Sequence, residues 1–449
     1  MSATEGRDPV NVSDFIDAGP WSLTQKLMLV LAAMAFAADG LANQVLGVAM
    51  PQIISQWGVE RSDMAPVAAI GLLGVAIGAI IGGIVGDRFG RRVGLIGSVL
   101  LFGAMTVLAS QVSDPHTLAG VRFVDGLGIG AAIPNGAALL TETTPQRRRA
   151  LALAVGMLFI ASGGLLSGLL GAALLPTVGW QGLFLFVGVG AIALALIFAA
   201  VLPESPNFLA QRPERQRELE KLLRRYNRDL PAGATFTDRP SQPGDRRWTA
   251  LIGPNLRAQT LGIWFGFFGC LLATYTLFSW LPTMLHGYGF ALTQTSTIMS
   301  AFNGGAMFGG LLSGFIMQKW GARLPSMAIA SAAVLVALSL AFIPVHPDEF
   351  TLMLVVYCVL GLLLAGLHNG FYTLAAISYP PVMRASSVGS AAAFGRLGAI
   401  LSSFTGVITM QLEGTWGFFV FMSIVLAVTC WCISFARPGE PGAKVAQHA

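Results

Sequence analysis

The sequence predicts an all-α membrane protein in which twelve transmembrane helices form two pseudo-symmetric six-helix bundles. Its 449 residues are 54% hydrophobic and 11% charged, and their mean hydropathy is +0.69, values far from those of a soluble globular domain. About twelve apolar stretches are long enough to cross ~30 Å of hydrocarbon. A short glycine- and arginine-rich motif also occurs twice, at residues 83–92 and 314–323. We therefore expect two repeated halves.

The apolar stretches form two groups of six, separated by one long polar segment. This division predicts an N-terminal tail at 1–24, an N-terminal bundle at 25–202, a linker at 203–257, a C-terminal bundle at 258–436 and a C-terminal tail at 437–449. The expected spans are 25–50, 64–86, 92–111, 117–141, 149–175, 180–202, 258–282, 291–317, 324–344, 350–377, 385–411 and 415–436.

The polar segments carry weaker signals. In the linker, 206–226 has charges at helical spacing and 230–245 is rich in proline and glycine, so we expect a surface helix followed by flexible chain. The N-terminal tail is expected to be solvated, with a short amphipathic turn at 12–16 that lies on the membrane. It has no apolar core, so no cleavable signal peptide is predicted.

The repeated motif relates the two halves without a gap. An offset of 231 carries one copy onto the other, and both copies follow the second span of their half. Parallel repeats of this kind are a transporter design, with substrate bound near the bilayer midplane at the interface of the repeats. The matched pairs are Gly83 and Gly314, Asp87 and Gln318, Arg88 and Lys319, Phe89 and Trp320, Gly90 and Gly321, and Arg92 and Arg323.

The positive charges predict the orientation. If both termini are cytoplasmic, 24 of the 27 Lys and Arg residues lie on the cytoplasmic side, and the exceptions are Arg61, Arg122 and Arg396. Because cytoplasmic loops accumulate Lys and Arg, we expect a multi-pass protein of the plasma (inner) membrane with both termini inside. The net charge of +5 is then a topological signal, and no nucleic-acid partner is expected.

Catalytic and metal-binding patterns do not occur in the sequence. Cys270, Cys358, Cys430 and Cys432 fall in apolar spans, without the spacing of a zinc site or a disulfide framework. No nucleophile is paired with a base. The sequence therefore predicts no enzyme, no metal and no cofactor other than a coupling proton.

Ionisable side chains within membrane spans cost about 2.5 to 3.5 kcal/mol each, so each needs a partner, a water-filled cavity or a function. Asp39, near the middle of the first span, has Asn43 one turn further on. We assign it to proton or substrate handling, and the alternative is a salt bridge to an arginine of another helix. Arg122 and Asp125 are three residues apart, so they form either a structural pair or a switch. Glu142 lies near the end of its span and completes the predicted proton-coupling set.

A substrate site is predicted around Arg396, which lies mid-span between two glycines with no acid within a turn. Arginine binds carboxylate with two parallel hydrogen bonds, so we expect it to anchor an anion. The alternative is packing against backbone carbonyls. His368 and Tyr372 are one turn apart in the tenth span and join the site, as does Asn43. Aromatic residues of the seventh span line a cavity for a flat ligand or pack between helices: Trp264, Phe267, Phe268, Tyr275 and Trp280.

These motifs resemble the major facilitator superfamily. Residues 83–92 match its signature between helices 2 and 3, and Arg122 with Gly126, Gly128 and Gly130 matches its helix 4 signature. Within it, the chain looks most like the aromatic acid:proton symporters. The carrying segments are Asp39-Gly40, Pro134-Asn135, Glu142-Thr143-Thr144-Pro145, Ser279-Trp280-Leu281-Pro282-Thr283, Arg384 and Gly395-Arg396-Leu397-Gly398. In two departures, Ala42 replaces the family's second helix 1 acid, and Asp125 stands where a neutral residue is expected.

The resemblance implies a monomeric transporter that imports a small organic anion with protons by alternating access, an aromatic carboxylate of the hydroxybenzoate type. An exporter is disfavoured because 161–164 lacks the expected proline, and a neutral-metabolite importer because it would not require Arg396. The resemblance also implies that Asp87 pairs across the halves near Arg384. The predicted conformational latch comprises Gly83, Asp87, Arg88, Gly90, Arg91, Arg92, Arg149 and Arg384.

Overall fold

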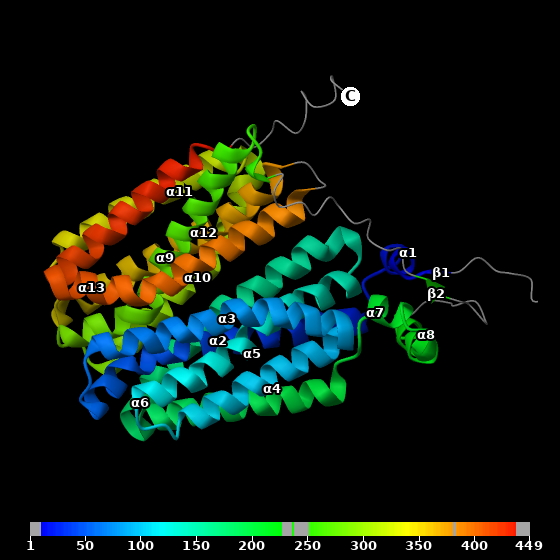
Figure 1. Ribbon diagram of the computed structural model, residues 1–449, viewed down its shortest axis with the longest axis horizontal. Coiled ribbons are helices and arrows are strands. Elements are labelled where there is room, and N and C mark those ends of the chain that lie inside the picture. Colours follow the sequence, from blue (N-terminus) through cyan, green and yellow to red (C-terminus); the bar gives the residue numbers. More distant parts are fainter. Residues whose placement is uncertain (1–9, 227–235, 238–250, 380–382, 437–449) are drawn as a thin grey trace, which may run out of the picture.

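The computed structural model describes residues 10–226, 236–237, 251–379 and 383–436. Long helices dominate it and gather into two bundles that lie side by side along the long axis (Figure 1). The N-terminal bundle comprises α2 (Leu23–Trp57), α3 (Arg61–Phe89), α4 (Arg91–Ala109), α5 (Pro115–Thr143) and α6 (Gln146–Val201). The C-terminal bundle comprises α9 (Arg257–Gly287), α10 (Leu292–Trp320), α11 (Arg323–Phe342), α12 (Phe350–Ile377) and α13 (Arg384–Ile433).

Two of these helices are interrupted. Gly179 has a φ of 69° within α6, and Glu413 and Gly414 have non-helical dihedral angles within α13. Among the residues described, nine helices, α6 and α13 included, are long and apolar enough to cross a membrane. Dividing α6 and α13 at their interruptions and adding the 29-residue α10 gives twelve segments, which is consistent with the predicted number.

Local sequence signals set where helices begin. At α2 the Ser22 side chain accepts a hydrogen bond from the Gln25 backbone N–H (3.3 Å), and the Gln25 side chain accepts one from the Ser22 N–H (2.8 Å). This capping box satisfies two donors that the first turn leaves unpaired. At α5 the Asp114 side chain accepts from the Thr117 N–H at 2.9 Å, and proline occupies the next position, as is typical of a helix start.

Glycines let the helices of a bundle approach closely. A Cβ on Gly78 of α3 would collide with the Leu127 carbonyl oxygen of α5, and a Cβ on Gly126 would collide with that of Gly71. A Cβ on Gly40 of α2 would likewise collide with the Ile160 carbonyl oxygen of α6. In lipid no hydrophobic force drives helices together, so their association depends on close packing. Small residues at the contacts permit it.

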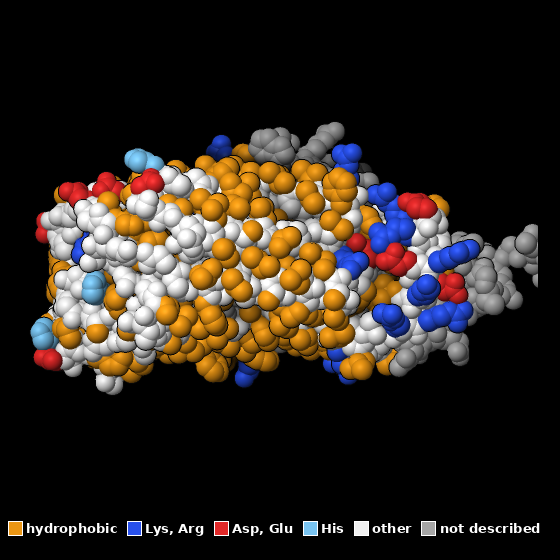
Figure 2. All heavy atoms as spheres, turned by 90° about the horizontal axis from the view of Figure 1, so that it is seen from below, with side chains coloured by type: hydrophobic (Ala, Val, Ile, Leu, Met, Phe, Trp, Pro, Cys, Tyr) orange, Lys and Arg blue, Asp and Glu red, His pale blue; other side chains and the backbone are white. Residues whose placement is uncertain are grey.

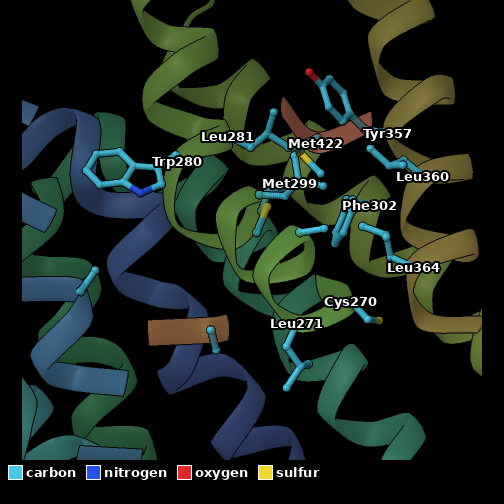
Figure 3. Close-up of a cluster of buried hydrophobic side chains, with 14 of the residues drawn as sticks. Cys270, Leu271, Trp280, Leu281, Met299, Phe302, Tyr357, Leu360, Leu364 and Met422 are labelled. Carbon is cyan, nitrogen blue, oxygen red and sulfur yellow. The ribbon is translucent and has the colours of Figure 1, made fainter. Parts of the chain in front are cut away.

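The surface matches a membrane environment. Figure 2 shows a broad hydrophobic band around the middle of the molecule, with charged side chains at its two ends. Phe315 of α10 and Phe342 of α11 are each more than two-thirds exposed. Beneath it, Figure 3 shows part of the C-terminal core, where Met299 and Phe302 of α10 lie near Leu360 and Leu364 of α12. Lipid would cover the exposed band.

The two ends of the molecule differ. We call the end that carries α7 (Pro206–Ala210) and α8 (Gln216–Arg224) the linker end. The opposite end, where α2 ends at Trp57 and α9 ends at Gly287, is called the hairpin end. Contacts between the bundles include a reciprocal amide pair of Gln44 and Asn303 (3.0 and 2.8 Å). A Cβ on Gly47 would collide with the Phe278 carbonyl, and Arg61 touches Gly287. These contacts lie at mid-helix and toward the hairpin end.

The N-terminal tail packs on the linker. Strand β1 (Val10–Asn11) pairs in parallel with β2 (Phe236–Thr237), and α1 (Val12–Asp17) follows β1. The prediction that 12–16 lies on the membrane is wrong, because Val12 and Ile16 are buried with Leu219 and Leu223 of α8. The predicted linker helix is present as α7, the 3-10 turn η1 (Pro213–Arg215) and α8. Of the predicted flexible stretch 230–245, only 236–237 lies within the described residues.

Candidate functional site

Asp39 of α2 and Arg396 of α13 belong to different halves and lie close enough to interact electrostatically. Asp39 is 1% exposed, and its Oδ1 has no hydrogen-bond partner in the described part of the chain. Arg396 attracts it electrostatically, but no salt bridge joins them within the described ranges. The alternative role of Asp39, a salt bridge to an arginine of another helix, is therefore not seen among the described residues, and Asp39 is a buried carboxyl with a cation nearby.

Arg396 is held against α9 by the glycines beside it. A Cβ on Gly398 would collide with the Phe268 carbonyl oxygen, and one on Gly395 would crowd Leu271. The guanidinium interacts electrostatically with Tyr275, His368 and Tyr372. No hydrogen bond or ion pair to it occurs among the residues placed in the structure, so its donors are available for an anion.

An aromatic cluster lies beside this cation. The rings of His368 and Tyr372 stack at 5.2 Å with 22° between their planes, and Phe267 packs edge-on to Tyr372 at 5.0 Å. Tyr372 is 41% exposed, so part of its ring is uncovered. The structure thus brings the predicted residues of α9 and α12 together beside the predicted anchor, and such rings suit a flat apolar ligand.

A second group of rings includes one residue that the sequence did not single out. Trp264 stacks on Phe394 at 5.5 Å, and Phe268 packs on the same ring at 6.0 Å. The Trp264 indole N–H donates to the Ser390 hydroxyl at 3.2 Å. Phe394 lies two residues before Arg396, but its pairing with α9 spans more than 100 residues of sequence, so no local pattern indicates it.

Asn43 and Tyr275 connect the halves. The Asn43 amide donates to the Tyr275 hydroxyl at 3.5 Å, across 232 residues of sequence. Both residues line a cavity of about 30 Å³ between α2, α3, α5 and α9. Arg122 also lines it, so two residues from the predicted substrate set meet one from the predicted proton-coupling set at this cavity.

Arg122 and Asp125 form a buried ion pair on α5. Asp125 also accepts a hydrogen bond from the Thr106 hydroxyl of α4 at 3.3 Å, and it repels Asp39 electrostatically. Of the two predicted alternatives, the structural pair is the one present in this conformation. The switch between partners stays a prediction.

Glu142 lies at the linker end, with residues predicted to form the latch. It accepts from Arg91 at 3.1 Å and from the Ser205 hydroxyl, while Arg91 also bridges to Asp87 at 2.5 Å. Of these partners, Arg91 belongs to the predicted latch set and Ser205 to the linker, although the sequence grouped Glu142 with the proton-coupling residues.

Glu204 contacts a residue of the predicted latch, and the sequence reasoning did not single it out. It is 2% exposed, and one carboxylate oxygen accepts from the backbone N–H groups of Arg92 and Ser205, each at 2.9 Å. It thereby caps the start of α4 and fixes the linker to the loop at Gly90. The sequence signal for it is weak, since Glu204 is simply an acid between Pro203 and Pro206 directly after the sixth predicted span.

Other residues of the predicted latch contact the N-terminal tail, the linker or their own half of the chain. Arg149 bridges to Asp17 of the tail at 3.6 Å, and the Arg88 carbonyl accepts from Arg212 at 2.9 Å. Arg384 begins α13. In this conformation Asp87 pairs with Arg91 of its own half, and the predicted contact with Arg384 is not formed among the described residues.

Comparisons with known proteins identify the family. The Major Facilitator Superfamily pattern matches residues 32–403. A gallate transporter of Pseudomonas putida is 32% identical and aligns over 90% of each chain, and a 4-hydroxybenzoate transporter of the same species is 30% identical over 91% of each. A solved D-xylose-proton symporter superposes with a TM-score of 0.69 at 17% identity, covering 92% of this chain and 98% of its own.

The predicted resemblance is confirmed, because these sequence relatives transport aromatic acids. The fold class is confirmed by the family match together with the superposition. The prediction that the protein is not an enzyme is confirmed as well, since its relatives are named transporters. The chain belongs to the Major Facilitator Superfamily of membrane transporters.

Proposed function

We propose that this protein imports a small aromatic carboxylate of the hydroxybenzoate type together with protons, by alternating access. The observation that carries the proposal is Arg396, a half-buried cation at the interface of the halves with no ion-pair partner in the described chain. A neutral substrate would not require this charge. The relatives named for gallate and 4-hydroxybenzoate support the same substrate class.

In the proposed binding mode, the carboxylate accepts hydrogen bonds from Arg396 and the ring lies against the aromatic cluster. His368 and Tyr372 already stack beside the guanidinium. Fork-shaped donors bind a carboxylate at two points, which fixes its orientation as well as its position. Trp264 and Phe268 would form a further part of the site's wall, because both rings pack on Phe394.

Asp39 is the proposed proton-coupling group. Its carboxyl and the substrate carboxylate would compete for the attraction of Arg396, because two buried anions cannot share one cation at low cost. Protonation of Asp39 would remove this conflict as substrate binds. A carboxylate that enters with one proton moves no net charge, so the pH gradient would drive accumulation, at about 1.4 kcal/mol per tenfold difference in proton concentration.

We infer that both termini face the cytoplasm of a plasma (inner) membrane. Figure 2 supports this orientation, because Lys and Arg gather at the linker end and cytoplasmic loops are enriched in these residues. The hairpin end then faces outward, and its contacts between the halves make the observed conformation inward-facing. One chain supplies both sides of the site, so we propose a functional monomer.

Uptake into proteoliposomes tests the proposal. With an imposed inward proton gradient, the protein should accumulate 4-hydroxybenzoate, and a protonophore should abolish the accumulation. Arg396→Ala should remove uptake, whereas Arg217→Ala in exposed α8 is the matched control and should retain it. Accumulation that persists after the gradient has collapsed would rule out proton symport.

Asp39→Asn separates binding from coupling. We expect this variant to exchange labelled for unlabelled substrate across the membrane but to lose accumulation driven by the gradient. Unchanged accumulation would remove Asp39 from the coupling mechanism. Unchanged uptake by Arg396→Ala would remove the proposed anchor.

A further inference from the structure

The small cavity between the halves has polar groups that the proposed binding mode does not use. Tyr275 lines it and lies one turn beyond Leu271 on α9, the residue that packs against Gly395 next to Arg396. The cavity is therefore adjacent to the proposed carboxylate site. Its volume of about 30 Å³ holds one or two water-sized groups and cannot take an aromatic ring.

Three side chains present hydrogen-bonding capacity to this cavity from both halves. The Asn43 amide donates to the Tyr275 hydroxyl, and no described residue pairs with the phenolic hydrogen or the Asn43 carbonyl oxygen, so both can bond an occupant. Ser279 adds a hydroxyl, one turn further along α9. The cavity thus contains donors and an acceptor, the combination that one hydroxyl group needs.

Arg122 supplies a further donor. One of its terminal nitrogens is held by Asp125, but its Nε is buried and has no hydrogen-bond partner within the described chain. The residue is only 5% exposed. Arg122 itself lines the cavity, so its positive charge lies near the wall and favours an oxygen over an apolar group there.

The rest of the wall is apolar and includes Leu72 and Phe278. These side chains offer an occupant no hydrogen bonds, so the few polar groups determine how it is oriented. A ring that extends from Arg396 toward Tyr275 would direct the substituent opposite its carboxylate into this space.

We propose that this cavity is the subsite for a ring hydroxyl, so that the transporter selects aromatic carboxylates with a hydroxyl opposite the carboxylate. The inference rests on the proposed function, since the carboxylate must be anchored at Arg396. A site built to hydrogen-bond a hydroxyl discriminates against an analogue that lacks it, because the buried polar groups then stay unpaired. A methyl group of similar size would fill the space without a hydrogen bond to Asn43 or Tyr275.

Equilibrium binding to the purified full-length protein in lipid nanodiscs tests this subsite. The ligands are 4-hydroxybenzoate and 4-methylbenzoate, which differ only in the group opposite the carboxylate. The readout is the ratio of their affinities. This ratio cancels any shift between conformations, which Tyr275→Phe could cause by breaking the bond to Asn43.

We expect the wild-type protein to prefer the hydroxylated ligand and Tyr275→Phe to lower the affinity ratio about fivefold, the worth of one neutral hydrogen bond. Ser279→Ala should lower it in the same direction. Tyr357→Phe is the matched control, because it removes a buried phenolic hydroxyl from the C-terminal core and should leave the ratio unchanged.

Two outcomes would overturn the proposal, and they differ in what else they overturn. If the wild-type protein binds both ligands but Tyr275→Phe weakens them equally, the cavity is not a hydroxyl subsite and the proposed transport function stands. If the wild-type protein binds neither ligand, the proposed function fails and this inference fails with it.

Discussion

The two copies of the repeated motif share a backbone but differ in their surroundings. In the first loop (residues 83–92), Gly90 joins α3 to α4 with a φ of 107° and a ψ of 152°; in the second loop (residues 314–323), Gly321 follows α10 with 77° and 170°. This region of dihedral space is essentially restricted to glycine. The two residues before each glycine also form the same contact, a cation beside an aromatic ring. Arg88 lies 5.5 Å from the Phe89 ring centre, and Lys319 lies 5.1 Å from that of Trp320.

The side-chain network is what separates them. A Cβ on Gly90 would collide with the Glu204 carboxylate, whereas a Cβ on Gly321 would meet nothing within 4 Å. Arg91 of the first loop has two acidic partners, but the second loop is tied by a bond from Arg323 to the Ser434 carbonyl at 2.6 Å. The repeat thus keeps the dihedral angles that the sharp turn requires, while the acidic contacts belong to the N-terminal half.

Replacing each glycine by alanine should give the largest contrast. Both variants incur backbone strain of about 1 to 3 kcal/mol, but Gly90→Ala must also displace Glu204, which is pinned by two backbone N–H groups. We therefore expect Gly90→Ala to lower the free energy of unfolding by at least about 3 kcal/mol and Gly321→Ala by less. Thermal unfolding in detergent measures both.

Equal losses in the two variants would contradict this account of the first loop. They would mean that the strain at the turn is the whole effect and that Glu204 moves aside at no cost. Glu204→Ala combined with Gly90→Ala then provides a check, because removing the carboxylate should relieve the collision and leave the double variant less destabilised than the two single losses added.

The repeat, the spans and the central residues could be predicted because each leaves a local signal. Hydrophobic length predicts a span, and a charged residue inside a span, such as Asp39 or Arg396, stands out by its cost. Contacts between distant segments leave no such signal. Phe394 meets Trp264 and Glu142 meets Arg91 only after folding, so Phe394 was missed and Glu142 was grouped with residues that it does not contact.

The tail shows the same limit. The spacing of Val12 and Ile16 predicts an apolar helix face, and α1 confirms that helix. What covers the face depends on the linker, whose Leu219 and Leu223 lie about 200 residues away and bury it. An amphipathic pattern specifies that a face will be buried, but it does not distinguish lipid from protein as the cover.

Removing Glu204 alone should have an intermediate effect. Glu204→Ala leaves the N–H groups of Arg92 and Ser205 without their charged acceptor, and we expect a loss of about 1.5 to 3 kcal/mol in the free energy of unfolding. Its counterpart in the second loop, Arg323→Ala, removes one bond to a carbonyl and should cost about 1 kcal/mol. Thermal unfolding of both variants in detergent measures which loss is larger. A larger loss for Arg323→Ala would mean that the Arg323 bond stabilises the protein more than the Glu204 contacts do.

Neutralising Asp87 should change stability least and conformation most. Its side chain is 71% exposed and pairs with Arg91, so Asp87→Asn should cost less than about 0.5 kcal/mol, as for other exposed ion pairs. If the acid contacts the start of α13 only when the linker end closes, its loss removes a contact from that closed state and shifts the population toward the conformation seen here. Labelling of a single cysteine, introduced near Arg384 in a cysteine-free background, should become faster.

The matched variant Gln318→Ala removes the equivalent side chain from the second loop and should leave the labelling rate unchanged. A rate that does not change in Asp87→Asn would show that the acid does not hold the linker end closed, and the two loops would then differ in stability alone.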